Sequence, residues 1–517
     1  MSKTICAGVS KIEITCEEGG TYDDLLPEKA KKHIPIEYLG TTLKVDDPLF
    51  ARVLVLDDGR GKIVLVTMDV TAIGARTISQ NILSDSADNF MPELRKQIEK
   101  EFNISGCQVS VSASHTHQAP RMLCDDGAQI ARIIGAIKIA LQNMVPVTIG
   151  VGSGFEDTIT FNRTLMLKNG TDHTLSPYPP EDEVERLRPV DPEIGILRID
   201  KLDGNPLAVI YNFGCHLLLG SPKGNSGHIT ADHVGVTLKY LEDHLGGETM
   251  AFFLQGLGGD VSEIFNYDLD KRHRTVDFGT TLGKSVLKGY HKIATGPADL
   301  KVVCKNMAFP FRTDISKIIS ALKDEQAILM ASLNTSYAYL LSFKEFLPLY
   351  LRYSLHPDYP SYLSFRYLRA AECGDSSIKE EDERNRLEIN KYLDRIRTME
   401  KMTRNELKIS MLKKHQEVID EIGTATIPAE IKGMKIGDCV YITAPMEMLV
   451  EVGFKVKKMS PFKYTYIASI SNGYLHYAPP ASYYGRGGYE VSECLLAPEW
   501  EDIFYTVVKD IFTELKK

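Results

Sequence analysis

The stretch LFARVLVLDDGRGKIVLVTMDV, residues 49–70, decides the fold class. It contains two runs of β-forming apolar residues, 49–57 and 62–70, and each run predicts a strand. The second run is apolar at nearly every position, which is typical of a strand that is buried on both faces.

Outward from this stretch, strand-like and helix-like patterns alternate over the first 300 residues or so. The apolar runs that predict further strands are 108–114, 207–213 and 250–255. The segments with helical periodicity are 92–102, 130–144 and 233–245. Apolar strands that alternate with amphipathic helices predict an α/β fold, a layered mixed sheet with flanking helices.

A different composition begins near residue 314 and lasts until about 421. It includes KEEDERNRLEINKYLDRIRTMEKM, in which charges of both signs recur at helical spacing. We expect a largely helical insertion within one domain that spans 1–517; a solvated helical layer packed on the sheet is the alternative. Strand-like sequence returns at 439–443 and 464–469, and an amphipathic helix is predicted at 499–515.

Composition limits the class of protein. The chain has 517 residues, 43% of them hydrophobic and 25% charged, which is typical of a globular protein. Its net charge of -9 and the lack of a Lys/Arg run argue against nucleic acid as a partner. We find no transmembrane segment of about 18 apolar residues and no secretory signal, so we expect a cytoplasmic protein.

The nine cysteines include no CxxC pair, and their odd number favours a reduced compartment. The sequence leaves the oligomeric state open, and a homo-oligomer is compatible with it.

Two histidines stand close together in SASHTHQAP, residues 112–120. His115 and His117 would lie on the same face of an extended backbone, so both imidazoles could reach one site. This spacing is typical of a metal site, although two structural histidines with ordinary hydrogen bonds would look the same.

A third histidine ends the run AVIYNFGCH, residues 208–216. His216 follows a predicted buried strand, which is a natural place for a metal ligand, although such a histidine is more often a core residue. We interpret the neighbouring Cys215 as apolar packing, while noting that zinc sites also use thiolates.

Three more segments place polar residues after apolar runs. The glycine loop in FFLQGLGGDVSE, 252–263, could direct backbone amides at an anion or form a plain turn. Glu447 in YITAPMEML follows a strand and a proline-containing turn, at a position where a helix could begin. Residues 468–490 crowd five tyrosines and four glycines into one segment, which is typical of binding surfaces and of packing alike.

In open α/β sheets, loops at the carboxyl ends of strands gather in one crevice. Imidazoles, a carboxylate and phenols that arrive there together would form a metal site. Nitrogen and oxygen donors favour zinc, with manganese or iron as alternatives.

These motifs together resemble the neutral/alkaline ceramidase family, the non-lysosomal N-acylsphingosine amidohydrolases. The resemblance covers most of the chain outside 314–421 and rests on short motifs. In chain order they are AGVSKIEIT, VTMDV, SASHTHQAP, FNRT, NFGCH, QGLGGDVS, APMEM and SNGYLHY through GGYE.

The resemblance implies a catalytic domain without the family's C-terminal β-sandwich domain, and a single Zn²⁺. Its implied zinc ligands are His115, His216, Glu447 and Tyr477. It also implies His117 as the general base, Arg163 and Tyr489 as catalytic and substrate-binding residues, and Ser262 as a substrate-binding residue.

The function that follows is zinc-dependent hydrolysis of a linear amide in a small N-acyl substrate, with a place in sphingolipid metabolism. The family motif continues as HTHSGPGG, whereas this chain reads HTHQAPRM. The substrate is therefore ceramide-like or a smaller N-acyl amine. The alternatives are hydrolysis of an ester or an N-acyl amino acid, and a non-catalytic binding protein on the same scaffold.

Overall fold

The structure, a computed structural model, divides into two compact units, Met1–Arg312 with Glu417–Lys517, and Thr313–Gln416. None of the helices among the described residues is long and apolar enough to cross a membrane. The residues that the structure describes are 5–15, 44–74, 89–119, 126–174, 179–223, 228–246, 248–264, 274–334, 342–361 and 363–517.

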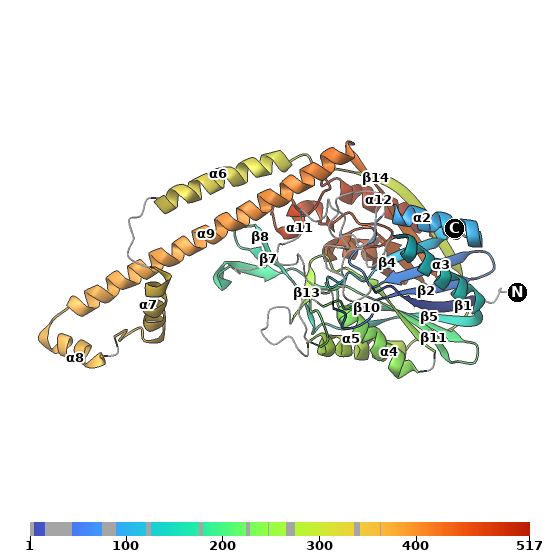
Figure 1. Cartoon of the computed structure of the whole chain (residues 1–517), viewed down its shortest axis with the longest axis horizontal. Coiled ribbons are helices and arrows are strands. Elements are labelled where there is room, and N and C mark those ends of the chain that lie inside the picture. Colours follow the sequence, from blue (N-terminus) through green and yellow to red (C-terminus); the bar gives the residue numbers. More distant parts are fainter. Residues whose placement is uncertain are drawn as a thin grey trace. The chain divides into compact units, whose positions relative to one another are not determined.

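The larger unit is built on an eight-stranded mixed sheet (Figure 1). Two neighbouring pairs, β11 with β12 and β3 with β4, are parallel, and the other pairs are antiparallel. The order of strands across the sheet is β12 (Met250–Gln255), β11 (Pro206–Phe213), β10 (Glu193–Lys201), β5 (Val145–Phe155), β1 (Cys6–Glu13), β2 (Phe50–Asp57), β3 (Lys62–Met68) and β4 (Val109–Ala113).

A second, four-stranded sheet packs against one face of the first. Side chains from both sheets, such as Leu54 and Leu56 on one and Met434 and Tyr441 on the other, share a single hydrophobic cluster. The strands of this sheet are, in order, β14 (Leu300–Pro310), β15 (Thr426–Ile436), β16 (Cys439–Thr443) and β18 (Tyr464–Ala468).

Helices cover the outer faces of both sheets and complete four layers. Alternate residues of β2 point in opposite directions, so Val53 and Val55 pack on helices while their neighbours face the second sheet. The helices on the eight-stranded sheet are α2 (Phe90–Phe102), α3 (Asp126–Gln142), α4 (Asp232–Leu245) and α5 (Arg274–Tyr290). Those on the four-stranded sheet are α10 (Val450–Met459) and α12 (Trp500–Lys516).

The predicted α/β class with a mixed sheet is therefore confirmed. The central strands are apolar throughout because they are buried between a helix layer and a second sheet. The contact between layers is close: a Cβ atom on Gly8 of β1 would lie 1.9 Å from the carbonyl oxygen of Ala140 in α3.

Short elements at the ends of the long strands carry the polar residues described below. The strands among them are β6 (Thr160–Asn162), β7 (Thr164–Leu167), β8 (Asp172–Thr174), β9 (Val184–Leu187), β13 (Val261–Glu263), β17 (Glu447–Met448) and β19 (Tyr477–Ala478). The helical turns are η2 (Gly106–Gln108), η3 (Glu181–Glu183), η4 (Ala481–Tyr483) and α11 (Tyr489–Ser492).

The smaller unit is helical, as the composition of 314–421 predicts. Its helices are α6 (Ile315–Asn334), α7 (Phe343–Leu355), α8 (Ser364–Cys373) and α9 (Ser377–Ile422), the last of which continues into the larger unit. Helices α6 and α9 are joined by Glu325, which pairs with Lys401 at 2.6 Å. The rings of Phe346 in α7 and Tyr392 in α9 stack with their centres 4.5 Å apart.

One disulfide joins Cys107 and Cys304, whose Cα atoms are 5.8 Å apart. It connects η2 to β14, two segments that are 197 residues apart in the chain. The sequence did not predict this disulfide: the odd number of cysteines favoured a reduced compartment, and pairing depends on spatial proximity that residue counts do not reveal.

Candidate metal centre and active site

Strand ends and short strands bring the predicted metal ligands together. His115 follows β4 and His216 follows β11, while Glu447 and Tyr477 face each other across the parallel pair β17 and β19. Glu447 therefore lies on a strand and not at a helix start, and α10 begins only at Val450.

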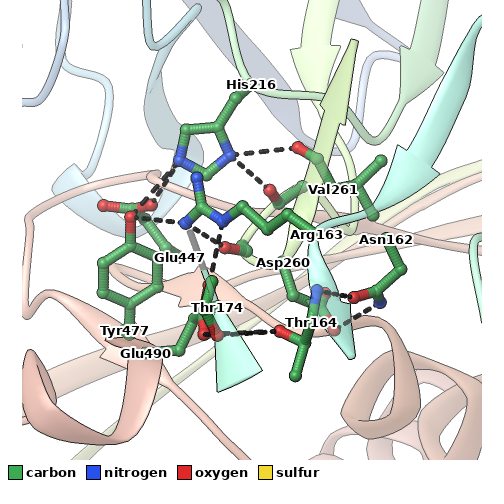
Figure 2. Close-up of polar contacts among 12 residues, drawn as sticks. Asn162, Arg163, Thr164, Thr174, His216, Asp260, Val261, Glu447, Tyr477 and Glu490 are labelled. Atoms are coloured by element: carbon green, nitrogen blue, oxygen red, sulfur yellow. Dashed lines mark hydrogen bonds and ion pairs between the residues drawn. The ribbon is translucent and has the colours of Figure 1, made fainter. Parts of the chain in front are cut away.

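The four side chains are buried and their polar atoms nearly touch. Oε2 of Glu447 lies 3.3 Å from Nε2 of His115 and 3.2 Å from Nε2 of His216. The phenolic oxygen of Tyr477 is 3.3 Å from the same nitrogen of His216 (Figure 2). The structure thus places two imidazoles, one carboxylate and one phenol around a single point.

Backbone carbonyls determine which histidine nitrogens carry the protons. Nδ1 of His115 donates to the carbonyl of Thr71 at 2.9 Å, and Nδ1 of His216 donates to that of Gly258 at 2.6 Å. A carbonyl oxygen only accepts, so each Nε2 is left with a lone pair. Among the described residues, Oε2 of Glu447 has no hydrogen-bond donor either.

Nε2 of His115, Nε2 of His216 and Oε2 of Glu447 therefore direct their lone pairs into one buried space. A cation bound between them would relieve their mutual repulsion. Nδ1–H groups held by carbonyls are the usual way to orient histidine ligands. The nitrogen and oxygen donors fit zinc.

Tyr474 holds the carboxylate in place. Its hydroxyl donates a short hydrogen bond to Oε1 of Glu447. Burial by itself would raise the pKa of Glu447, but His115 and His216 lower it well below its usual range. The group is therefore an anion at neutral pH. Sequence reasoning missed this role, since nothing in the motif distinguishes Tyr474 from the other tyrosines of 468–490.

His117 lies beside the ligands. Its Nε2 is 3.3 Å from Nε2 of His115, and its ring is half-buried. The sequence predicts that His115 and His117 share one face of an extended backbone. The two rings do lie together, but His115 has a φ of 72°, so the backbone turns there instead of extending. Burial, followed by the proximity of the imidazoles of His115 and His216, lowers the pKa of His117 well below its usual value. The ring is neutral near pH 7 and can accept a proton.

Arg163 follows β6 and binds the phenol of Tyr477. Its Nη2 donates to the Tyr477 oxygen at 3.0 Å and to the carbonyl of Gly259 at 2.9 Å. Its Nε donates to Glu490 at 2.9 Å (Figure 2). Burial, followed by the charge of Glu447, raises the pKa of the Tyr477 phenol well above its usual value, and the positive charge of Arg163 opposes this rise. Glu490 was not predicted as a site residue; its only signal was a lone carboxylate at the end of the tyrosine-rich segment.

Tyr489 begins α11 at the edge of this group. Its ring centre lies 5.6 Å from that of Tyr477, and the guanidinium carbon of Arg163 lies 5.6 Å from the Tyr489 ring centre. Burial raises the pKa of its hydroxyl, which therefore stays a neutral donor. Unlike Tyr477, this ring is partly exposed.

The glycine loop supports His216 through carbonyls. The backbone amides of Gly256, Gly258 and Gly259 donate to other backbone carbonyls, so none of the three is free for an anion. The carbonyls of Gly258 and Gly259 instead accept from His216 and Arg163. The possibility that this loop binds an anion through these amides is therefore wrong: the loop positions ligands.

Ser262 stands on β13, where it pairs with Phe161 of β6. Among the described residues, no hydrogen bond joins the hydroxyl of Ser262 to His115, His117 or His216. Its neighbour Val261 accepts a hydrogen bond from Nδ1 of His216 at 3.2 Å, so this strand reaches the centre through its backbone.

The fold and the centre define a four-layer α/β protein with a buried set of imidazole, carboxylate and phenol donors. No model of a known protein family matches the chain. A search of curated proteins likewise finds no match.

Solved structures do match. The neutral ceramidase from Pseudomonas aeruginosa has a similar structure, with a TM-score of 0.61 and 13% identity over 100% of this chain and 75% of the ceramidase chain. A ceramidase complexed with C2 is similar too, with a TM-score of 0.61 and 14% identity over 99% of this chain and 75% of the other. The expected likeness to neutral ceramidases is confirmed at the level of the fold.

Proposed function

We propose that this protein is a zinc-dependent hydrolase that cleaves the amide bond of an N-acyl substrate, either ceramide-like or smaller. The observation that carries the proposal is that Nε2 of His115 and Nε2 of His216 both lie within 3.3 Å of Oε2 of Glu447, while Nδ1 of each histidine is bonded to a backbone carbonyl. The similarity in fold to neutral ceramidases supports the same chemistry.

His115, His216, Glu447 and Tyr477 would hold the zinc. When bound, the metal supplies Lewis acidity and lowers the pKa of a water from about 15.7 to about 7. The chain's own groups then move the protons. His117 is neutral and adjacent, so it accepts the proton of the attacking water and returns it to the leaving amine.

The amide oxygen gains negative charge as the carbonyl carbon is attacked. Tyr489 is a neutral phenol at the edge of the centre and can donate a hydrogen bond to that oxygen. Arg163 adds positive charge nearby, while its two bonds to Tyr477 and Glu490 keep it in place. We assign Arg163 to substrate orientation as well, because its guanidinium carbon lies 5.7 Å from the ring centre of Tyr477 and 5.6 Å from that of Tyr489. Ser262 has no assigned step.

The proposal is tested by a panel of N-acyl amines, ceramides, N-acyl amino acids and esters, with products identified by mass spectrometry. We expect an amide substrate to be cleaved by the zinc-loaded protein, and cleavage to stop after chelation and to return with zinc. His216→Ala should lose both zinc and activity, whereas His244→Ala, an exposed histidine of α4, should keep both. Cleavage of esters alone would contradict amide specificity, and an unchanged rate without metal would contradict the zinc requirement.

A further inference from the structure

A second cluster of ligand-type side chains lies behind His216. Cys215 lies just after the end of β11 and directly before His216. His233 lies in the first turn of α4, and Glu263 is the last residue of β13. All three are buried, with exposed fractions of 1% or less, and one ligand atom from each lies within 4.8 Å of the others. The proposed hydrolysis uses none of them.

The cluster contains polar atoms that have no partner among the described residues. Oε1 of Glu263 accepts from the amide of Leu218 at 2.6 Å, but Oε2 has no partner. Nε2 of His233 donates to the carbonyl of His216 at 3.2 Å, which leaves Nδ1 with a lone pair and no partner. A buried polar atom without a partner destabilises the folded state, so an occupant that satisfies these atoms would stabilise the fold.

We propose that Cys215, His233 and Glu263 bind a second divalent cation of the zinc class, as thiolate, imidazole and carboxylate. A thiolate among the ligands selects zinc-like metals over magnesium or calcium, which prefer oxygen alone. This proposal goes beyond the hydrolytic function and does not depend on it.

Charge balance favours this occupant. One thiolate and one carboxylate carry two negative charges, which a divalent cation neutralises, and a neutral cluster is the form that tolerates burial best.

The position of the cluster suggests what the second ion would do. Cys215 precedes His216 in the chain, and the ring of His233 donates to the His216 carbonyl. An ion that fixes Cys215 and His233 would restrain the backbone on both sides of a primary ligand. The second site would therefore be structural and would stiffen the support of the first.

The test is metal loading during expression, which avoids any need for an ion to enter a closed interior. Protein produced with cobalt should contain two ions per chain and show a near-ultraviolet absorption from thiolate-to-cobalt charge transfer. Cys215→Ser should lose this absorption and one ion. Cys439→Ser, a matched variant of a buried thiol in β16, should keep both, and His115→Ala should keep the absorption.

Glu263→Gln is a second test variant. Its side chain has the shape of a protonated carboxyl group, so it should fold even if Cys215→Ser does not. We expect it to hold the second cobalt at least tenfold more weakly than the unaltered protein. One ion per chain without thiolate absorption in the unaltered protein, or an absorption that Cys215→Ser preserves, would overturn the proposal.

Discussion

The phenol of Tyr474 donates a hydrogen bond to one carboxylate oxygen of Glu447, and this leaves the other oxygen facing His115 and His216. One oxygen is thereby held in place while the second stays available. The carboxylate cannot rotate away without breaking a buried hydrogen bond, so it is oriented before any cation arrives.

Tyr474→Phe should weaken zinc binding about 10–100-fold, the usual effect of removing a group that orients a metal ligand. The ring remains, so packing is preserved. Competition with a chromophoric chelator measures the affinity. Tyr211→Phe, which removes another buried hydroxyl, in β11, is the matched control and should bind zinc normally. Equal affinity in the two variants would remove Tyr474 from the centre.

His117→Ala should separate metal binding from catalysis. We expect zinc content to stay at the unaltered level while the rate of amide cleavage falls about 10²–10⁴-fold, because a positioned base is lost. His115→Ala, by contrast, should lose the zinc itself, because it removes a ligand. Elemental analysis beside steady-state kinetics provides both readings, and retention of full activity by the His117 variant would refute its assignment as the base.

The buried pair of Arg163 and Glu490 should show strong coupling. Removing one partner leaves an uncompensated buried charge, so Arg163→Met or Glu490→Leu alone should lower the free energy of unfolding by about 3–5 kcal/mol. The double variant should lose less than the sum of the two. Urea unfolding of the unaltered protein, the two single variants and the double variant measures this coupling.

The exposed pair Lys239–Asp243 is the control, and substitutions there should change the free energy of unfolding little. Additive losses at the buried pair would show that the contact is not coupled.

Lys432 should make stability rise with pH. It is fully buried, its Nζ donates to the carbonyl of Val109 at 2.5 Å, and burial lowers its pKa to about 7. In the unfolded chain its pKa is about 10.4, so between about pH 7 and 10 the unfolded state binds more protons than the folded state.

The contribution of Lys432 to stability is therefore present above about pH 10.4 and is lost as the pH falls towards 7. Relative to Lys432→Met, the free energy of unfolding of the unaltered protein should rise by about 1.4 kcal/mol per pH unit within this window. Urea unfolding at a series of pH values measures the difference. A difference that stays constant or falls with pH would show that the amine is charged in the folded state.

Much of the fold was predictable because its signals are local. The run 49–70 encodes two buried strands through its own apolar pattern, and the strands and helices around it follow from the same kind of periodicity. The helical stretch 314–421 was visible in its charge spacing. The four-layer packing was not predictable, since a strand buried by a second sheet has the same composition as one buried by helices.

The predicted ligands do come together, but part of the reasoning behind them differs from the structure. His115 and His117 meet through a turn at positive φ instead of an extended strand, and the glycine loop contributes carbonyls where amides were considered. Tyr474 and Glu490 could not be selected in advance, because their roles depend on partners 27 and 327 residues away.

The sequence by itself determined where strands end, which side chains with metal-binding chemistry follow them, and which family the motifs resemble. Those properties depend on residue type and on spacing over a few positions. Only the tertiary structure decided that Glu447 lies opposite Tyr477, that carbonyls set the protons of His115 and His216, and that Cys215 shares a cluster with His233 and Glu263. The physical reason is that distances between segments far apart in the chain arise from packing of the whole core, which local patterns do not encode.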